Sequence, residues 1–370
     1  MTRRLILCAT AICANVSIAA DVGSDGRWIP EGLPEEGGEV ALSKTGHNIT
    51  AAYLSSDAAR APIPVTFNKD ATKVTLAVPT GKGGDVVLEV AEKTTQFPDG
   101  RIVLSALDAK VKGETAKLET HPGNHRIGFW IELVDTVHWD YKATRPGMYD
   151  VELSYSLAGD GNSRVEISLG KEAAEGELAP TGSWYRYSTA RIGRMYIHKP
   201  GKLPVGVRGL QKGGGALMNL KAVTLRPAPE GKAAVQAEDG TIELDASAAT
   251  VHSTLMQYER KPQKLCLGYW ANPKDWASFT FPVNRPGKFK VELTQGCGRG
   301  HGGSEVAVHV AGEKLEFVVD DTGGFQNWKV RDLGEVEFEK AGEHRLEVRP
   351  KNKKGVAVMD IRRIRLVPVP

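Results

Sequence analysis

The 370-residue chain has little cysteine, few aromatic residues and almost no net charge. Two of its four cysteines, Cys8 and Cys13, lie within the first twenty residues. The formal net charge is +3 with both signs interspersed, so no basic face indicates a nucleic-acid partner. Beyond the first twenty residues, no apolar run is long enough for a membrane span and no window keeps a helical period. These absences disfavour membrane-spanning, nucleic-acid-binding and helical classes of protein.

The first twenty residues have the pattern of a secretory signal peptide. A short basic start at Arg3 and Arg4 precedes a mostly apolar run, and small residues follow at 17–20. The alternative is a buried N-terminal strand. We therefore expect an exported chain, secreted or periplasmic. Cys266 and Cys297 would remain in it, either as a disulfide or as two small buried side chains.

The strongest signal in the sequence is an internal duplication. The run GYWANPKDW from Gly268 matches GFWIELVDTVHW from Gly128, 140 residues earlier. The run TGGFQNW from Thr322 matches TGSWYRY from Thr181, 141 residues earlier. RPGKFKVEL and VMDIRRIRL also have earlier copies at these offsets, as RPGMYDVEL and LMNLKAVTL. A period of this length is the size of a domain, so the sequence predicts two homologous domains.

Both copies, and the region before them, read as β-structure. Short runs alternate apolar and polar residues between Gly, Pro, Asn and Asp, and VTFNKDATKVTLAVP reads as a hairpin around Asn68. The predicted fold class is all-β: a small N-terminal antiparallel β domain followed by two homologous jelly-roll β-sandwiches. The predicted boundaries are a signal peptide at 1–20, a β domain at 21–96 with a poorly ordered lead-in at 23–38, and sandwich repeats at 97–227 and 237–370.

The runs VQAEDGTIEL, GYW, DWASFTF, RPGKFKVEL, TGGFQNW and KAGEHRLEVRP resemble the galactose-binding-like, jelly-roll carbohydrate-binding modules attached C-terminally to bacterial α-L-fucosidases and sulfatases. The resemblance is clearest over 237–368. It implies a polysaccharide or glycan as ligand, and a glycoside hydrolase or sulfatase acting on the same substrate as partner. Phe325 stands where many members have Trp, and Met359 where binding members often have Asn.

The resemblance also implies the site residues. In such modules aromatic side chains in loops at one end of the sandwich stack on sugar rings, with amide and imidazole groups nearby. Carried over, the sugar-binding residues are Tyr269, Trp270, His301, Phe325, Gln326 and Asn327 in the second copy and Phe129, Trp130 and Trp184 in the first. The resemblance further implies a structural Ca²⁺ in the second repeat, held by Glu238 and Asp360. For Trp139, Trp276 and Trp328 the strand-like context favours burial in the core.

No catalytic pattern stands out in the sequence. Asp320 and Asp321 are neighbours on one strand and so point to opposite faces, whereas a retaining glycosidase needs two carboxylates across one cleft. There is no G-x-S-x-G run and no zinc-spaced His and Cys set. We expect a non-catalytic glycan-binding protein. The alternatives are a fucosidase-related protein without its catalytic barrel, and a structural or protein-binding cell-surface protein.

Overall fold

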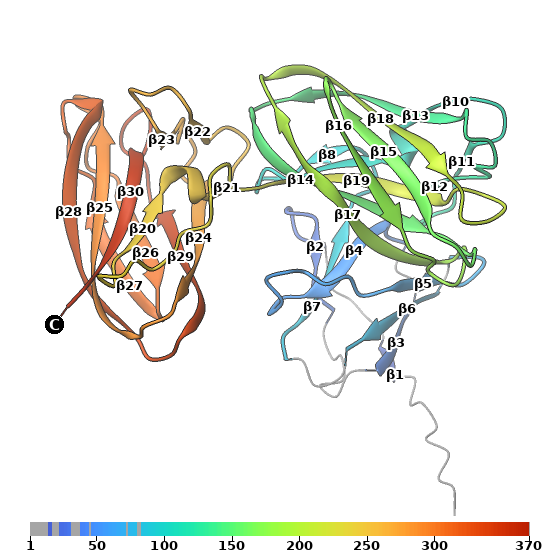
Figure 1. The fold of residues 1–370 in the computed structure, drawn as a ribbon, viewed down its shortest axis with the longest axis horizontal. Coiled ribbons are helices and arrows are strands. Elements are labelled where there is room, and N and C mark those ends of the chain that lie inside the picture. The colour runs from blue at the N-terminus through green and yellow to red at the C-terminus, as the bar shows by residue number, and fades with distance from the viewer. Residues whose placement is uncertain are drawn as a thin grey trace, which may run out of the picture.

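A computed structural model describes residues 14–16, 22–30, 38–43, 46–71, 73–79 and 83–369 (Figure 1). The fold class predicted from the sequence is confirmed: in this part of the chain the only helical segments are two single 3-10 turns, Ala106–Asp108 and Ala246–Ala248. Within the same residues, no helix has the length and apolar character to span a membrane. Of the predicted signal peptide, only Ala14–Val16 (β1) is described, pairing in parallel with Gly38–Ser43 (β3). Its other residues lie outside the described part, and the signal peptide stays a prediction.

The N-terminal region forms two small sheets with a common core. One has the order β2-β7-β4, and in the other β1, β3, β6 and β5 follow one another. The predicted hairpin is confirmed, with Thr66 opposite Thr75. Within the predicted lead-in at 23–38, Trp28 lies in a strand and is 3% exposed. Residues 31–37 are outside the described part, and the poorly ordered lead-in stays a prediction. The further strands are β2 Arg27–Trp28, β4 Ile49–Leu54, β5 Val65–Phe67, β6 Lys73–Val78 and β7 Val86–Val90.

The two repeats are β-sandwiches with the same strand order. In the first, one sheet has the order β10-β13-β18-β15-β16, and the other runs β11-β12-β19-β14-β17 with β9 beside β19. In the second, the sheets are β21-β24-β29-β26-β27 and β22-β23-β30-β25-β28 with β20 beside β30. Each of these eleven strands therefore has a counterpart in the other copy, as the duplication predicts.

The strands of the first sandwich, after β8 at Thr95–Gln96, are β9 Ile102–Ser105, β10 Lys110–Lys112, β11 Lys117–Glu119, β12 Arg126–Gly128, β13 Thr136–Ala143, β14 Gly147–Ser156, β15 Ser163–Leu169, β16 Glu172–Leu178, β17 Arg186–Ile197, β18 Gly201–Gln211 and β19 Asn219–Pro227. Those of the second are β20 Ile242–Asp245, β21 Thr250–His252, β22 Gln257–Glu259, β23 Cys266–Gly268, β24 Trp276–Val283, β25 Gly287–Cys297, β26 Glu305–Val310, β27 Glu313–Val318, β28 Gly324–Phe338, β29 Gly342–Pro350 and β30 Asp360–Pro368.

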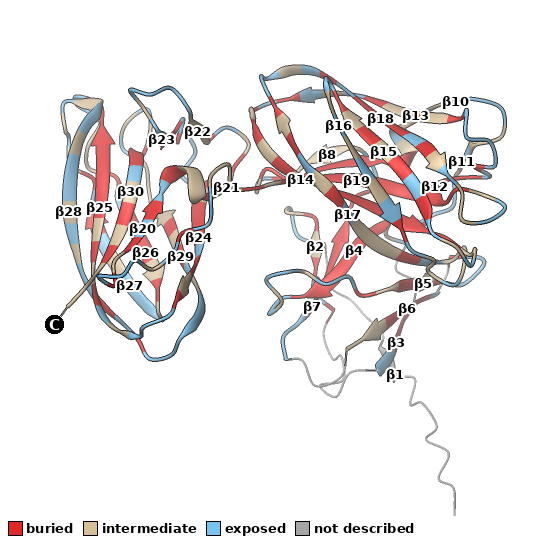
Figure 2. Ribbon diagram, viewed as in Figure 1, coloured by how far each residue is buried: buried red, intermediate tan, exposed pale blue. Residues whose placement is uncertain are grey.

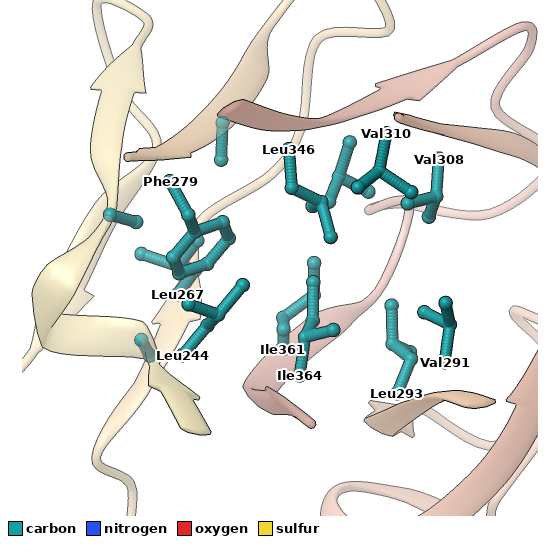
Figure 3. Close-up of a cluster of buried hydrophobic side chains, with 14 of the residues drawn as sticks. Leu244, Leu267, Phe279, Val291, Leu293, Val308, Val310, Leu346, Ile361 and Ile364 are labelled. Atoms are coloured by element: carbon teal, nitrogen blue, oxygen red, sulfur yellow. The ribbon is translucent and has the colours of Figure 1, made fainter. Parts of the chain in front are cut away.

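Alternating side chains fill the space between the two sheets of each sandwich. In the second copy, Leu244, Leu267 and Ile361 come from one sheet and Phe279 and Leu346 from the other (Figure 3). All five are at most 1% exposed. Burial of this apolar surface is the main stabilising contribution to such a fold. The outward-facing residues of the same strands are more exposed, notably along β28 (Figure 2).

The N-terminal region is hydrogen-bonded into the first sandwich. Strand β5 pairs with β17 at Arg186 and Tyr187, so the small sheet and a sheet of the sandwich are continuous (Figure 1). Beneath this junction Glu89 accepts hydrogen bonds from Arg226 at 2.5 and 2.8 Å and lies 2.6 Å from Arg101. Burial acts to raise the pKa of Glu89, but the two guanidinium groups outweigh it and hold that pKa well below its usual range.

The two remaining cysteines are separate thiols. Cys266 in β23 and Cys297 in β25 lie on opposite sides of β30, and both are fully buried. Strands two positions apart are roughly 9–10 Å apart, whereas a disulfide needs Cα atoms within about 7 Å. Of the two alternatives left open by the sequence, the structure has two buried free thiols.

Candidate functional site

Each sandwich carries a pocket at the same place. The first has a volume of about 280 Å³ and is lined by Glu119, Arg126, Phe129, Ile131, Trp184, Tyr185, Ala216 and Asn219. The second has a volume of about 380 Å³ and is lined by Glu259, Lys264, Tyr269, Ala271, Phe325, Gln326, Val356, Ala357 and Asp360. Seven positions correspond at the offsets of 140 and 141 that relate the repeats. The duplication has therefore kept a pocket as well as a fold.

An exposed aromatic residue forms one wall of each pocket. Phe129 follows the end of β12 and is 51% exposed; Tyr269 follows the end of β23 and is 58% exposed. Both have left-handed backbone conformations, with φ of 54° and 59°. Bulky residues rarely adopt this conformation, and strain of this kind concentrates at functional sites. The same strained, exposed aromatic in two copies indicates a function for these rings.

The strained residue sets the direction of the tryptophan that follows it. Trp130 and Trp270 are each 0% exposed, and the backbone carbonyls of both accept a hydrogen bond, from Leu217 and Val358, at 2.8 and 2.9 Å. The prediction that Trp130 and Trp270 bind sugar is therefore wrong, because side chains buried in the core offer no surface to a ligand. They anchor the loop from below, while the residue before them faces the pocket.

A second aromatic residue faces each pocket, from just before β17 in the first copy and from the start of β28 in the second. Trp184 lines the first pocket and Phe325 the second. A threonine fixes each loop: the Thr181 hydroxyl accepts the N–H of Leu157 at 2.9 Å, and the Thr322 hydroxyl accepts that of Cys297 at 2.8 Å. In the first copy Ser156 and Asn219 also donate to the Trp184 carbonyl, at 2.9 and 3.1 Å. The Thr-Gly motif thus positions the aromatic residue two or three positions beyond it.

A glycine opens the floor of each pocket. A Cβ atom on Gly128 would lie 2.2 Å from Glu119 Oε2 and 3.1 Å from Asn219 Oδ1. On Gly268 it would lie 2.3 Å from Glu259 Oε1 and 3.3 Å from Asp360 Oδ1. Only glycine leaves space beside these oxygens, so both pockets keep a polar floor within reach of a ligand.

The two floors differ in charge. In the first pocket Glu119 accepts a hydrogen bond from Arg126 Nε at 2.8 Å, and Lys117 Nζ lies 4.0 Å from the centre of the Phe129 ring. In the second, Lys264 pairs with Glu259, while the place of Asn219 is taken by a carboxylate, Asp360. With Asp360 ionised, the charged side chains named here sum to one net positive charge in the first pocket and one net negative charge in the second.

Asp360 is an unusual carboxyl group. It is 3% exposed, and Cys266 Sγ and Gln326 Nε2 donate to its Oδ2 at 3.6 and 3.2 Å. Burial, together with the nearby Glu259 carboxylate, raises the pKa of Asp360 to about 7. Burial also raises the pKa of the Cys266 thiol, with a further contribution from Asp360. The acid therefore changes its charge near neutral pH.

The other predicted sugar-binding residues divide into two groups. Phe129, Trp184, Tyr269, Phe325 and Gln326 all line a pocket. His301 lies behind the second pocket, with its ring stacked on Phe325 at 6.3 Å between centres.

Asn327 does not line the pocket. Its amide donates to the Thr322 carbonyl at 3.1 Å within its own turn, so the structure gives this predicted site residue a local role. The three tryptophans predicted to be in the core also differ from one another: Trp139 is 3% exposed, whereas Trp276 and Trp328 are only half-buried.

The predicted Ca²⁺ pair of Glu238 and Asp360 is wrong. Glu238 is exposed and precedes β20, where Ile242 is opposite Leu366. Leu366 lies six residues along β30 from Asp360, roughly 20 Å at the rise of a strand. The two carboxylates therefore lie near opposite ends of the sandwich and cannot share an ion.

A different group around Asp360 could hold a metal ion. One ligand atom each of Glu259, Cys266 and Asp360 lies within 4.8 Å of the others. This set does not fit Ca²⁺, which takes six to eight oxygen ligands. A thiolate with two carboxylates is closer to a zinc set, but the thiol pKa is raised, which favours its protonated form.

The sequence reasoning missed the charged residues of the floors other than Asp360, which it assigned to a metal site. Glu119 and Glu259 are 140 residues apart, the offset of the duplicated motifs, and this spacing could have marked them. Arg126 and Lys264 do not correspond in this way, because the residues at their counterpart positions are Cys266 and Asn124. Only the folded structure brings each cation to its glutamate.

The chain belongs to the family described as Domain of unknown function (DUF5077), whose model matches residues 110–229 and 256–368, well over half of the chain. One matched segment lies in each sandwich. No curated protein matches the chain. The sequence resemblance to modules of fucosidases and sulfatases remains a prediction beside this family membership.

Several solved structures are similar to parts of the chain. A family 35 carbohydrate binding module from Clostridium thermocellum is 19% identical, with 34% of this chain and 96% of that chain covered and a TM-score of 0.30. CBM35 from Cellvibrio japonicus Abf62 is 16% identical, with 34% and 91% covered and a TM-score of 0.29. A Paenibacillus xanthan lyase is 17% identical, with 87% and 32% covered and a TM-score of 0.33. We rest the functional proposal on the two pockets and not on these similarities.

Proposed function

We propose that the protein is a non-catalytic carbohydrate-binding protein with one glycan pocket in each sandwich. The observation that carries this proposal is the pair of exposed aromatic residues, Phe129 and Tyr269, held in the same strained conformation at the same place in both copies. Each lines its pocket together with a second aromatic, Trp184 or Phe325. Sugars have weakly apolar ring faces and hydroxyl rims, so they suit a pocket with aromatic walls and a polar floor.

The biological setting is a further part of the proposal. The pattern of residues 1–20 supports export, to the periplasm or the medium. The resemblance of the second repeat to modules of bacterial α-L-fucosidases and sulfatases supports an accessory role in the degradation of fucosylated or sulfated glycans. These glycans are therefore the first ligands to screen, and a glycoside hydrolase or sulfatase acting on them is the expected partner.

A glycan array followed by calorimetric titration of the full chain without residues 1–20 tests this function. Trp184→Ala and Tyr269→Ala should each lower the affinity of one pocket about tenfold or more, because each removes a stacking surface. The double variant should no longer bind, and the exposed Val330→Ala should bind normally. A blank array, or binding that survives in the double variant, would contradict the proposal.

One observation favours a second candidate, a protein-binding role for the first repeat. Ile131, which lines the first pocket, and the nearby Leu133 and Val134 are 40%, 39% and 68% exposed. Their counterparts in the second repeat are Ala271, Pro273 and Lys274, so this apolar rim is not part of the shared framework. Exposed apolar clusters mark interaction surfaces. If this role is correct, replacing Leu133 and Val134, which do not line the pocket, by serine should abolish capture of a protein partner and leave sugar affinity unchanged.

A further inference from the structure

The floor of the second pocket presents two free carboxylate oxygens side by side. In Glu259, Oε2 is paired with Lys264, whereas no described residue donates to Oε1. In Asp360, Oδ2 accepts from Cys266 and Gln326, whereas no described residue donates to Oδ1. The position of a Cβ on Gly268, 2.3 Å from Oε1 and 3.3 Å from Oδ1, shows that the two oxygens converge on one small space.

This space belongs to the pocket and is closed from the protein side. Asp360 is 3% exposed and Cys266 beside it is 0% exposed, yet Glu259 and Asp360 both line the pocket. Neither free oxygen is enclosed by protein, so both can be reached from the pocket. A ligand that brings hydrogen-bond donors and a positive charge would complement both oxygens.

The first pocket provides the internal comparison. There the corresponding glutamate oxygen, Glu119 Oε2, already accepts from Arg126 Nε at 2.8 Å, and Asn219 stands in place of Asp360. The cation that serves this floor is therefore built into the protein. In the second copy Cys266 replaces Arg126, and the cation of this floor, Lys264, pairs with Oε2 of Glu259, so no cation of the protein stands beside Oε1. The walls of the second pocket are Tyr269 and Phe325, whose ring faces also attract cations.

We infer that the second pocket selects a saccharide carrying a primary ammonium group, an amino sugar that is not N-acetylated, with the ammonium between Glu259 and Asp360. This inference rests on the proposed glycan-binding function and deepens it for one pocket. The ammonium takes the place that the Arg126 guanidinium occupies in the first copy. Its three N–H donors suit two free carboxylate oxygens and the ligand's own solvent or hydroxyl contacts.

Glucosamine oligosaccharides and their N-acetylated forms make a matched pair of probes, because they share a backbone and differ in one charge per sugar. The titrations use the Trp184→Ala chain, in which the first pocket is weakened, at a pH where the amine is charged and Asp360 has lost its proton. The charged oligosaccharide should bind about tenfold or more tightly than the acetylated one, as expected for hydrogen bonds to charged groups. Added salt should reduce that difference.

Two variants locate the effect. Asp360→Asn installs the residue of the first repeat, and Glu259→Gln removes the other charge; each should abolish the preference for the charged sugar. Glu335→Gln changes an exposed carboxylate on β28 that does not line the pocket, and should leave the preference intact. Two independent variants keep the test informative if one of them alters the fold.

The remaining outcomes overturn the inference in distinguishable ways. If both oligosaccharides bind equally and Tyr269→Ala abolishes both, the pocket takes neutral sugars and only the inference fails. If neither these nor any glycan on the array binds, the proposed function fails with it. If binding appears only with added Zn²⁺ or Ca²⁺ and is lost with a chelator, Glu259, Cys266 and Asp360 hold a metal ion in place of an ammonium group.

Discussion

The first and second sandwiches share a framework of strands and loops. They differ in what covers their outer faces and in the charges of their pocket floors. Both have the same eleven strands, the same Thr-Gly loop and the same strained aromatic residue. The outer face of the β14–β19 sheet is covered in the first copy by the N-terminal region, which leaves Arg226 and Glu152 buried at 5% and 8% exposure. At the corresponding face of the second, Glu292 pairs with Arg365 in a half-exposed position. Duplication thus fixed the frame, while its faces and pocket floors diverged.

This comparison separates two kinds of charge. Glu89, Arg101 and Arg226 form a buried cluster that joins the N-terminal region to the first sandwich. The charges of the second sandwich, apart from the buried Asp275, lie at its surface or in its pocket. We therefore expect substitutions in the first copy to act mainly on stability and those in the second mainly on binding and its pH dependence.

The largest loss of stability should come from Glu89→Gln. This change leaves two buried guanidinium groups without their shared carboxylate, which costs about 3–5 kcal/mol. The matched control is Glu292→Gln, which breaks an exposed pair worth about 1 kcal/mol or less. Denaturant unfolding with hydrogen exchange should place the loss in the N-terminal region, β14 and β19. If Glu89→Gln and Glu292→Gln lowered the free energy of unfolding equally, the distinction between a buried charge cluster in the first copy and surface pairs in the second would not hold.

The next effect is a pH dependence confined to the second sandwich. Asp360 has its pKa raised to about 7 by burial and by Glu259, so the folded state holds this proton between the ordinary value of 3.8 and about 7, where the unfolded chain has lost it. The free energy of unfolding should therefore fall as pH rises through that window, on the order of 2–4 kcal/mol.

Asp360→Asn should remove most of this fall, because Glu259, Lys264 and Cys266, the other titratable groups facing this position, remain in place. The remainder comes from Asp275, whose pKa is also raised by burial. The first sandwich has Asn219 here and should show no such dependence. Calorimetric melting of the wild type and the variant across this pH range provides the measurement. Parallel curves would mean that Asp360 ionises at an ordinary pH and that the two floors differ less than the structure indicates.

A smaller effect, equal in the two copies, is expected for Thr181→Val and Thr322→Val. Each removes the acceptor for a buried backbone N–H, of Leu157 or Cys297, and should cost about 1–2 kcal/mol. Thr280→Val, at an exposed position of β24, is the control. Denaturant unfolding gives the loss of stability of each variant, and hydrogen exchange shows whether that loss is located in the loop. If one variant lost much more stability than the other, the threonine would not have the same structural role in the two copies.

Much of this frame could be predicted from the sequence, because period-two alternation and a constant offset are local and repetitive signals. The orientation of Trp130 and Trp270 could not. Alternation gives no sign that the preceding Phe129 or Tyr269 is left-handed, a conformation expected of glycine. The junction of β5 with β17 was also out of reach, since it joins residues 65–66 to 186–187 with no pattern in common.

The smallest effect should come from Gly268→Ala, and its comparison with Gly128→Ala tests whether the two floors are held with equal firmness. In Gly268→Ala the new methyl group meets the end of the Glu259 side chain, whose partner Lys264 is half-exposed and can move with it. In Gly128→Ala it meets Glu119 Oε2, which is fixed by the nearly buried Arg126. We expect stability to change by less than about 1 kcal/mol in Gly268→Ala and by more in Gly128→Ala.

Each variant should also weaken sugar binding at its own pocket alone, because the methyl group fills the space beside the floor oxygens. Melting temperatures and titrations of both variants would measure these two effects. A larger loss of stability in Gly268→Ala than in Gly128→Ala would mean that the second floor is the more rigid one. That result would contradict the proposal that the second floor has space for a ligand cation.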